Sequence, residues 1–350
     1  MVYNSCVMAS TTKIINTALN GLSPRQREVL EGRFGLKGGE GETLAAIGDR
    51  MGITRERVRQ IENAALAVAK TNITGDAEAV ALLDKIKKYI AGNGGVAKKV
   101  DVAAYADALA KGIGENQIDF LSEASAAFNV YREDEDYHPF YYVTDKDLKN
   151  AQAFVDGWSH FLKSKKENAF SAATYQAELA NFSKTKAIEN TLAQNYLSIT
   201  KRIHSNRFGD IGLREWPEIN PTTIRDKIYL VLKKGGAPLH FEDIAKKIND
   251  VKFDAQVALA PTVHNELIKD ERFVLVGRGM YALKEHGYEP GTAREVIAKV
   301  LKTSGPMKAT DVVARVNRQR FFKENTILIN LQNRSAFERL SDGRYRVREA

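Results

Sequence analysis

A short run of polar side chains between residues 54 and 60 has the composition of a surface that reads nucleic-acid bases. The run begins at Thr54 and contains five longer polar side chains, namely Arg55, Glu56, Arg57, Arg59 and Gln60. Arginine can make a bidentate contact to guanine, glutamate can accept a hydrogen bond from cytosine, and glutamine can pair with adenine. A solvated helix face with Glu–Arg pairs has the same composition, so the run by itself leaves both interpretations open.

The residues around this run predict a helix-turn-helix that would hold it at a surface. We expect Thr43 to cap a helix that ends near Met51, Gly52 to allow the chain to reverse, and Thr54 to cap the next helix. Apolar residues recur at helical spacing in that next helix, at Val58, Ile61, Ala65 and Val68. The polar residues form i,i+4 pairs on the opposite side of the helix. The pattern therefore favours a helix held from behind, with its polar side exposed.

An earlier helix is predicted just upstream. Ser23 is the expected N-cap, Pro24 occupies the first helical position, and Gln26 follows three residues after the cap, which is a capping-box arrangement. One apolar stripe follows, made of Val29, Leu30 and Phe34. The glycine-rich stretch KGGEGE then breaks the pattern, so residues up to 72 are expected to form several short helices.

Residues 20–70 closely resemble region 4 of the primary sigma factors of bacterial RNA polymerase. The resemblance is carried by the motifs REVLEGRFGL and TLAAIGDRMGITRERVRQIE, which stand at that family's internal spacing. It implies that the second helix of the helix-turn-helix reads a promoter hexamer of the minus-35 type in the major groove of double-stranded DNA.

The same resemblance assigns roles to individual residues. It implies base reading for Arg55, Glu56 and Gln60, and phosphate or base-edge contacts for Arg57 and Arg59. Further candidates for contact with DNA are Thr54, Arg25, Arg33 and Thr43.

The sequence also departs from the sigma pattern. Only about twenty residues precede the motif, whereas sigma factors carry large domains upstream of region 4 that grip the polymerase and melt the promoter. We therefore expect no stand-alone promoter melting. Region 4 of that family also docks on the polymerase flap, which makes the core of a bacterial-type RNA polymerase a second expected partner.

Charge is unevenly distributed along the 350 residues. The net charge of +8 divides into +3 for residues 1–72, −6 for 73–145, +3 for 146–221, +2 for 222–287 and +6 for 288–350. The two ends are therefore expected to attract phosphate, while the acidic segment should repel it. Its acidic turn REDEDY is predicted to be solvated.

A pattern of about 70 residues repeats four times after residue 72. Each copy has a long amphipathic helix, two shorter helices and two β-like runs around a turn, with leading helices expected near residues 79, 147, 223 and 293. The fold expected is mainly α with small β-wings: a helix-turn-helix at 1–72, followed by winged-helix units at 73–145, 146–221, 222–287 and 288–350.

The last two units resemble, less specifically, the HARE-type winged helix-turn-helix known from the delta subunit of bacterial RNA polymerase. The resemblance is carried by TTIRDKIYLVLKKGGAPLHFEDIAKKI and by VGRGMYAL. Winged helices bind proteins as well as DNA, so it leaves the ligand of each unit open.

The final unit has the stronger electrostatic case for DNA. Its basic residues cluster where the second and third helices meet and along the closing strand, where alternate residues share a face. The secondary phosphate contacts predicted from this clustering are Arg315, Arg318, Arg320, Arg344 and Arg346.

Other functions find little support in the residues. Six histidines are scattered singly and there is one cysteine, so we expect no metal site, no cofactor and no enzyme activity. No apolar run is long enough to span a membrane, no small-molecule substrate is evident, and the single cysteine suits the cytoplasm. The leading hypothesis is a sequence-specific DNA-binding transcription factor. The alternative is an accessory or anti-initiation protein of RNA polymerase that uses winged helices as protein adaptors.

Overall fold

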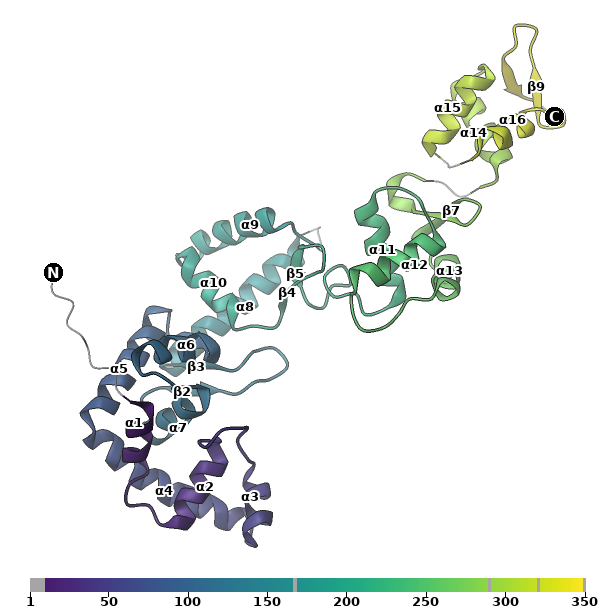
Figure 1. Ribbon diagram of the computed structural model, residues 1–350. Helices are drawn as coiled ribbons and strands as arrows, with labels where there is room; N and C mark the ends of the chain where they lie inside the picture. Colours follow the sequence, from purple (N-terminus) through teal and green to yellow (C-terminus); the bar gives the residue numbers. More distant parts are fainter. Residues whose placement is uncertain (1–9, 166–168, 289–290, 320–321, 349–350) are drawn as a thin grey trace. The chain divides into compact units, whose positions relative to one another are not determined.

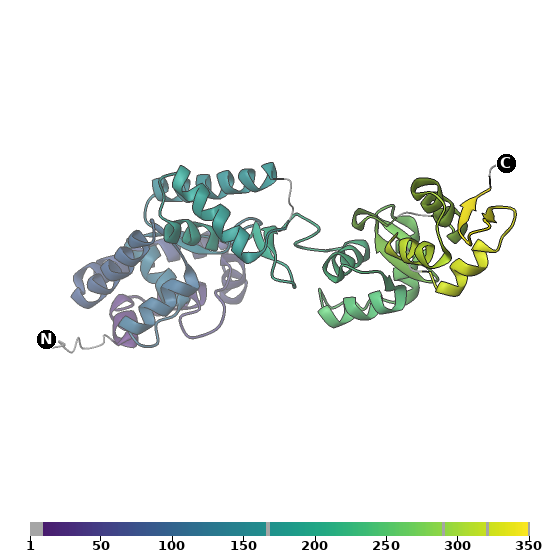
Figure 2. The ribbon, with the colours of Figure 1, turned by 90° about the horizontal axis from the view of Figure 1, so that it is seen from above.

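The computed structural model describes residues 10–165, 169–288, 291–319 and 322–348. The chain divides into two compact bodies. The first contains the residues up to His204 together with Ile211–Arg214, and the second contains Ser205–Asp210 together with the residues from Glu215 onward. Helices make up most of both bodies, and the strands form only small antiparallel sheets (Figures 1 and 2). The prediction of a mainly helical chain with small β-elements is confirmed.

Four helices form what we call the head, residues 11–75 (Figure 1). They are α1 Thr11–Ala18, α2 Pro24–Phe34, α3 Leu44–Met51 and α4 Arg55–Gly75. The predicted capping box is present, because Ser23 Oγ accepts from the Gln26 amide at 3.3 Å and Gln26 Oε1 accepts from the Ser23 amide at 3.0 Å. The domain boundary expected at residue 72 falls inside α4. That helix continues to Gly75 because Ile73 extends its buried stripe.

The first body then holds two copies of the repeated pattern. Module 1 consists of α5 Ala77–Gly92, β1 Val96–Lys98, α6 Lys99–Leu109, α7 Glu115–Ser125, β2 Asn129–Tyr131 and β3 Phe140–Tyr142. Module 2 consists of α8 Asp145–Ser164, α9 Ala172–Thr185, α10 Asn190–Ser198, β4 Ile203–Ser205 and β5 Ile211–Leu213. The ribbon of module 2 was expected within residues 207–216, but its first strand lies earlier, at Ile203–Ser205.

The second body holds two more copies. Module 3 consists of α11 Ile224–Gly235, β6 Leu239–His240, α12 Phe241–Val251, α13 Ala260–Lys269, β7 Phe273–Gly277 and β8 Met280–Leu283, followed by a short 3-10 helix, η1 Lys284–His286. Module 4 consists of α14 Ala293–Ser304, α15 Ala309–Gln319, α16 Glu324–Leu331, β9 Phe337–Arg339 and β10 Tyr345–Val347.

The four modules share one order of elements. Each has a long helix, a short strand or single bridge, two further helices, and a closing hairpin whose second strand pairs with the first strand or bridge. The leading helices begin within two residues of the positions predicted from the sequence. Modules 3 and 4 each enclose a separate apolar core.

Module 1 shares a core with the head instead of standing apart from it. One continuous cluster of buried side chains includes Leu30 and Phe34 of the head together with Phe120 of α7. The rings of Phe34 and Phe120 meet edge to face with centroids 5.5 Å apart. The Asn116 side chain of α7 also donates to the carbonyls of Gly35 at 3.3 Å and Gly39 at 2.9 Å. The third helix of module 1 is therefore docked on the head.

Module 2 is docked on module 1 through its own third helix. Asn195 of α10 donates to the carbonyls of Asn93 at 2.5 Å and Val96 at 2.8 Å, and the Tyr196 hydroxyl donates to the carbonyl of Gly94 at 3.2 Å. The carbonyls of Asn93 and Gly94 belong to the turn between α5 and β1, and that of Val96 belongs to the first residue of β1. A helix in the same place in two modules is thus used for contacts between parts of the protein.

The acidic turn of module 1 is exposed over residues 132–135, as predicted, and two of its carboxylates are also paired. Lys201 lies 2.5 Å from Glu133, and Arg202 lies 2.6 Å from Asp136. Hydrogen bonds from Lys201 and Arg202 hold the pKa values of the Glu133 and Asp136 carboxyls below their usual range. The sequence pattern could not show this pairing, because the two cations come from module 2.

Candidate nucleic-acid interface

Two threonine caps and two glycines shape the helix-turn-helix of the head. Thr43 Oγ1 accepts from the Ala46 amide at 3.1 Å, and Thr54 Oγ1 accepts from the Arg57 amide at 3.2 Å, so each helix begins where the sequence predicted. Gly52 has a left-handed backbone with φ of 66°, a conformation that favours glycine. A Cβ atom on Gly48 would lie only 2.7 Å from the carbonyl oxygen of Ile53. The tight turn between α3 and α4 therefore depends on glycine at both positions.

The back of α4 is held by a small apolar core. Val58 of α4 is fully buried with Val29 of α2 and Ile47 of α3. Partly buried neighbours complete this core, namely Leu44, Met51, Ile53 and Ile61. Burying these side chains fixes which side of α4 faces outward, as the apolar spacing predicted.

The predicted base-reading residues lie together on the exposed side of α4. Every side chain from Thr54 to Gln60 is exposed, apart from that of Val58, which is buried. Arg59 donates to both carboxylate oxygens of Glu56, at 2.9 and 2.7 Å, and Arg57 donates to Gln60 Oε1 at 2.9 Å. The pairs have i,i+3 spacing instead of the expected i,i+4. Side chains at either spacing are neighbours on a helix surface.

The pairing leaves one arginine of the set available. Among the described residues no hydrogen-bond or ion-pair partner is found for Arg55, although it stands at the first position of α4. The hydrogen bond from Arg59 keeps the pKa of the Glu56 carboxyl below its usual value. The same bond raises the pKa of Arg59. Within two turns of α4, the surface thus presents the guanidinium of Arg55, which is unpaired among the described residues, the carboxylate of Glu56 as a charged acceptor, and the side-chain amide of Gln60.

The other candidates of the head occupy different settings. Arg25 is exposed in the first turn of α2, and Thr43 caps α3. Arg33 is half-buried, and it donates to the Glu62 carboxylate at 3.1 Å and to the Glu42 carbonyl at 3.1 Å. The sequence did not single out Arg50, which joins Glu42 and Glu28 at the surface of the helix-turn-helix. Arg33 and Arg50 therefore connect the helices of the head.

The basic residues of module 4 are placed on two of its elements. Arg346 lies in β10 opposite Glu338 of β9 and pairs with that residue at 2.9 Å. Arg344 pairs with Asp342 in the connecting turn at 2.6 Å, and Arg315 of α15 donates to Ser304 Oγ at 2.5 Å. Arg320 lies outside the described residues, and the side chain of Arg318 lies outside them as well. The sequence did not point to Arg334, which is exposed shortly before β9, or to Arg339, which is exposed as the last residue of β9.

Within the described ranges, no group of three histidine, cysteine, aspartate or glutamate side chains is placed to hold a metal ion. None of the helices in those ranges combines the length and the apolar character needed to cross a bilayer.

The comparison with known families decides what the head resembles. Residues 18–68 match Sigma-70, region 4. This confirms the resemblance read from residues 20–70. The RNA polymerase sigma-B factor of Nostoc sp. is 54% identical over 56 residues, which are 16% of this chain and 17% of that protein. The chloroplastic RNA polymerase sigma factor sigF of Arabidopsis thaliana is 42% identical over 59 residues, which are 17% and 11% of the two chains. SigA4 of Synechococcus elongatus is 52% identical over 52 residues, 15% and 17% of the two.

The match is confined to the head. The chain spans less than one fifth of the length of each of these curated relatives, and all four modules lie outside the matched residues. The comparison therefore identifies a Sigma-70 region 4 segment in the head, and the three relatives that share this segment are named as RNA polymerase sigma factors.

Proposed function

We propose that this chain is a sequence-specific DNA-binding transcription factor that acts in or on transcription initiation. The observation that carries the proposal is the exposed polar set on the first two turns of α4, inside the segment that matches Sigma-70 region 4. In this proposal α4 enters the major groove at a minus-35-type element. Its neighbours α2 and α3 hold it from behind through the core around Val58.

The roles proposed for individual residues are those that the resemblance to sigma region 4 implies. Arg55, Glu56 and Gln60 contact base edges, and Arg57 and Arg59 contact phosphates or base edges. Arg25, Thr43 and Thr54 stand at helix starts, where backbone amides and side chains favour phosphate. Arg33 is the least accessible of the candidates, since its guanidinium is engaged by Glu62 and Glu42.

The four modules are assigned as winged-helix units, and the last two as the HARE type. Their common order of helices and hairpin supports this assignment. Module 4 supplies backbone contacts through Arg315, Arg344 and Arg346, and the assignment extends to Arg318 and Arg320. Exposed ion pairs such as Arg346–Glu338 are worth little in water, so these arginines can exchange their carboxylate partners for phosphate.

Genome-wide footprinting of the purified chain, with and without core RNA polymerase and at several salt concentrations, tests this function. Protection of a recurring hexamer by the chain alone is the expected result. Protection of the hexamer only when polymerase is present would contradict the proposal that the head reads the promoter directly. A catalytic role forms no part of the proposal.

A second candidate function is an accessory or anti-initiation protein of RNA polymerase. It is favoured by one observation, namely that α7 and α10 occupy the third-helix position of their modules and contact protein instead of solvent. This candidate expects co-purification with core polymerase, for instance through its flap, in high salt and without DNA. Loss of the complex in high salt would count against it.

A further inference from the structure

The loop between α2 and α3 of the head, residues 35–43, is rich in glycine and lies largely at the surface. Residues 37–41 are exposed. Gly38 and Gly39 have φ of 102° and 97°, and a Cβ atom on either would meet no atom within 4 Å. Glycine has more conformations to lose than other residues, so ordering this loop carries a high entropic cost. Contacts from another element can offset that cost.

One side chain of module 1 holds this loop from outside the head. Asn116, the second residue of α7, donates through its side-chain amide to the carbonyls of Gly35 at 3.3 Å and Gly39 at 2.9 Å. These carbonyls flank a turn in which the Gly38 amide donates to Gly35 at 3.0 Å. A Cβ atom on Gly35 would lie only 2.9 Å from Asn116 Nδ2. We call this contact the Asn116 clamp.

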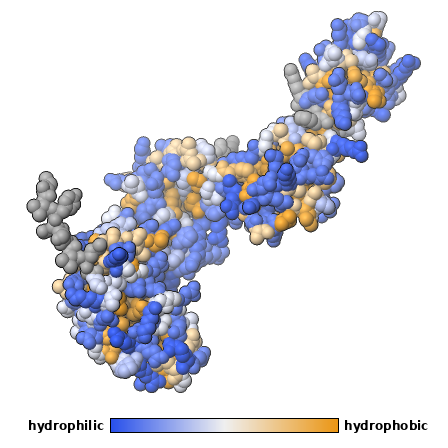
Figure 3. Space-filling view, viewed as in Figure 1, coloured by the Kyte–Doolittle hydropathy of each residue, from blue (hydrophilic) through white to orange (hydrophobic). Residues whose placement is uncertain are grey.

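Helix α7 is a firm support for the clamp. Its Ile118, Phe120 and Leu121 side chains are fully buried in the core that the head and module 1 share. The head and module 1 accordingly form one continuous surface in Figure 3. A cleft of about 480 Å³ lies along the seam between them, lined in part by Gly41 and Asn116. Module 1 therefore leaves the loop open to solvent and holds it through the clamp.

The far end of the loop is connected to both helices of the helix-turn-helix. The Glu42 carbonyl accepts from Arg33 Nη1 at 3.1 Å, and Arg33 Nε donates to Glu62 of α4 at 3.1 Å. The Glu42 carboxylate accepts from Arg50 of α3 at 3.2 Å. The next residue, Thr43, caps α3. The position of the loop thus bears on the start of α3 and on α4 just after the exposed polar set.

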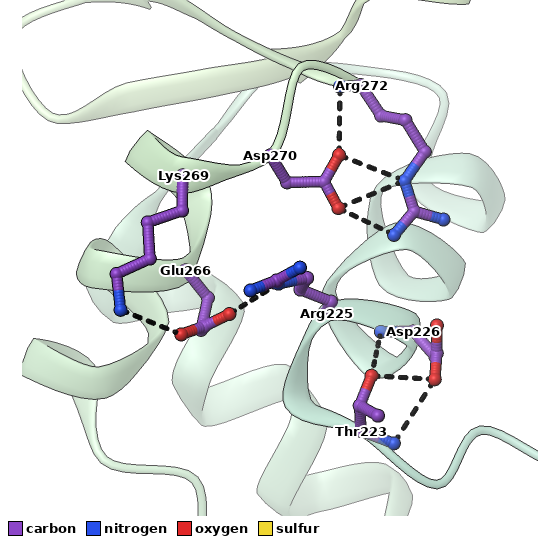
Figure 4. A network of polar contacts seen from close by, with 7 residues as sticks. All are labelled: Thr223, Arg225, Asp226, Glu266, Lys269, Asp270 and Arg272. Carbon is purple, nitrogen blue, oxygen red and sulfur yellow. Dashed lines mark hydrogen bonds and ion pairs between the residues drawn. The ribbon is translucent and has the colours of Figure 1, made fainter.

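The ion pairs of module 3 form a network that stays inside one module. Figure 4 shows Arg225 of α11 bonded to Glu266 of α13 at 2.5 Å, and Arg272 bonded to Asp270 at 2.7 Å. Every residue drawn there belongs to module 3. That network holds the elements of a single module together, whereas the network of the head continues along the loop to Asn116 of module 1.

We propose that Asn116 is a positioning residue for DNA reading and that module 1 is part of the DNA-binding unit. This inference rests on the proposed function, in which α4 enters the major groove. The clamp orders the loop before DNA arrives, so binding does not bear the entropic cost of ordering it. Asn116 acts on DNA only through Thr43 and α4. Such a role suits module 1, because the net charge of −6 over residues 73–145 would repel phosphate.

The substitution that tests the clamp is Asn116→Asp, which keeps the shape of the side chain. An acidic residue in the first turn suits the helix dipole, so α7 should keep its fold. The carboxylate cannot donate to either carbonyl, and it faces both of their oxygens. Asn129→Asp in β2 is the matched control, since it places the same charge on the same module. The bond that it removes, from Asn129 Nδ2 to the Val143 carbonyl at 3.3 Å, lies outside the loop.

Stopped-flow binding measures the effect, with the full chain and a fluorescent duplex that carries the hexamer protected by the wild-type chain. We expect Asn116→Asp to slow association about tenfold, because only molecules with an ordered loop bind. The dissociation rate and the order of preference among single-base variants should stay unchanged. Hydrogen exchange at the Gly38 and Glu42 amides, which donate within the loop and to α2, should become faster in the free variant. Asn129→Asp should match the wild type in every respect.

Three results would overturn the role of Asn116. The first is an unchanged association rate in Asn116→Asp, which would leave the clamp a structural contact alone. The second is an equal loss in Asn129→Asp, which would assign the effect to charge. The third is a loss that comes from faster dissociation, which would place the action of Asn116 within the complex. Failure of the proposed function looks different, because the wild-type chain would then prefer no duplex.

Discussion

The head and module 4 are both basic, but they arrange their arginines differently. Helix α4 places arginines beside a glutamate and a glutamine, and it leaves Arg55 without a partner among the described residues. The ribbon of module 4 sets Arg344 and Arg346 against one carboxylate each and presents no amide in the same row. A mixed set of donors and acceptors can distinguish bases, whereas a row of cations neutralises phosphate whatever the sequence. In the proposed function, α4 is therefore the surface that reads bases, and the ribbon of module 4 is the surface that contacts phosphates.

The largest effect is expected from Gly48→Ala, which should damage the reading surface as a whole. The new Cβ would lie 2.7 Å from the Ile53 carbonyl, so the turn between α3 and α4 must shift. We expect a loss of about 1–3 kcal/mol in local stability and a loss of DNA binding by the head. Native-state hydrogen exchange of the amides in α3 and α4 measures the change.

Gly75→Ala is the matched control for Gly48→Ala. Gly75 is also helical, and a Cβ there would meet no atom within 4 Å. We expect no loss of protection, and a gain of up to about 1 kcal/mol from the lower entropy of the unfolded chain. Equal losses for both variants would show that the close approach at Gly48 is unimportant.

Gln60→Ala should change specificity. We expect the preference at one base pair of the site to relax, at a cost of about 1–3 kcal/mol for the preferred sequence. Binding titrations against the preferred duplex and its single-base variants measure this. Equal weakening of binding to every duplex would show that Gln60 contacts the DNA backbone. It would then not differ in role from the arginines of module 4.

Arg346→Ala should have a smaller effect that is the same on all sequences. We expect uniformly weaker binding, with the slope of log K against log salt reduced by about one. Arg272→Ala, which removes an exposed and paired arginine of module 3, is the matched control and should leave the slope unchanged. A change in base preference for Arg346→Ala would contradict its assignment to phosphate.

The smallest effect concerns the Glu56–Arg59 pair and its pH dependence. The pair lowers the pKa of Glu56 in the folded protein, so its contribution is present above the ordinary glutamate pKa and is lost as pH falls through the lowered value. An NMR titration of the Glu56 carboxyl should give a midpoint below about 4.3, the value of an unperturbed glutamate. Arg59→Ala should return the midpoint toward that value, and an unchanged midpoint would show that the pair does not persist in solution.

Much of the head could be predicted because its signals are local. The caps at Ser23, Thr43 and Thr54 lie within three residues of the amides they bind, and Val58 and Ile61 show their burial through helical spacing alone. The exposed set on α4 followed from the same periodicity. The order of helices and hairpin in the modules was likewise visible in the repeated pattern.

Contacts between distant residues could not be predicted in this way. Phe120 is apolar at a helical spacing that also fits an ordinary core, so nothing in its surroundings indicates that it meets Phe34 of the head. The ion pair of Arg33 could not be predicted either, because its partner Glu62 lies 29 residues further along the chain. The acidic turn is exposed, as predicted, but its ion pairs could not be predicted because their cations belong to the next module.

Selection from a library of random DNA duplexes by the purified full chain tests the central claim most directly. The account predicts enrichment of one short element of the minus-35 type by the wild-type chain, with the information lost at a single base pair in the Gln60→Ala variant. Recovery of duplexes without a common sequence, at every salt concentration that permits binding, would contradict it.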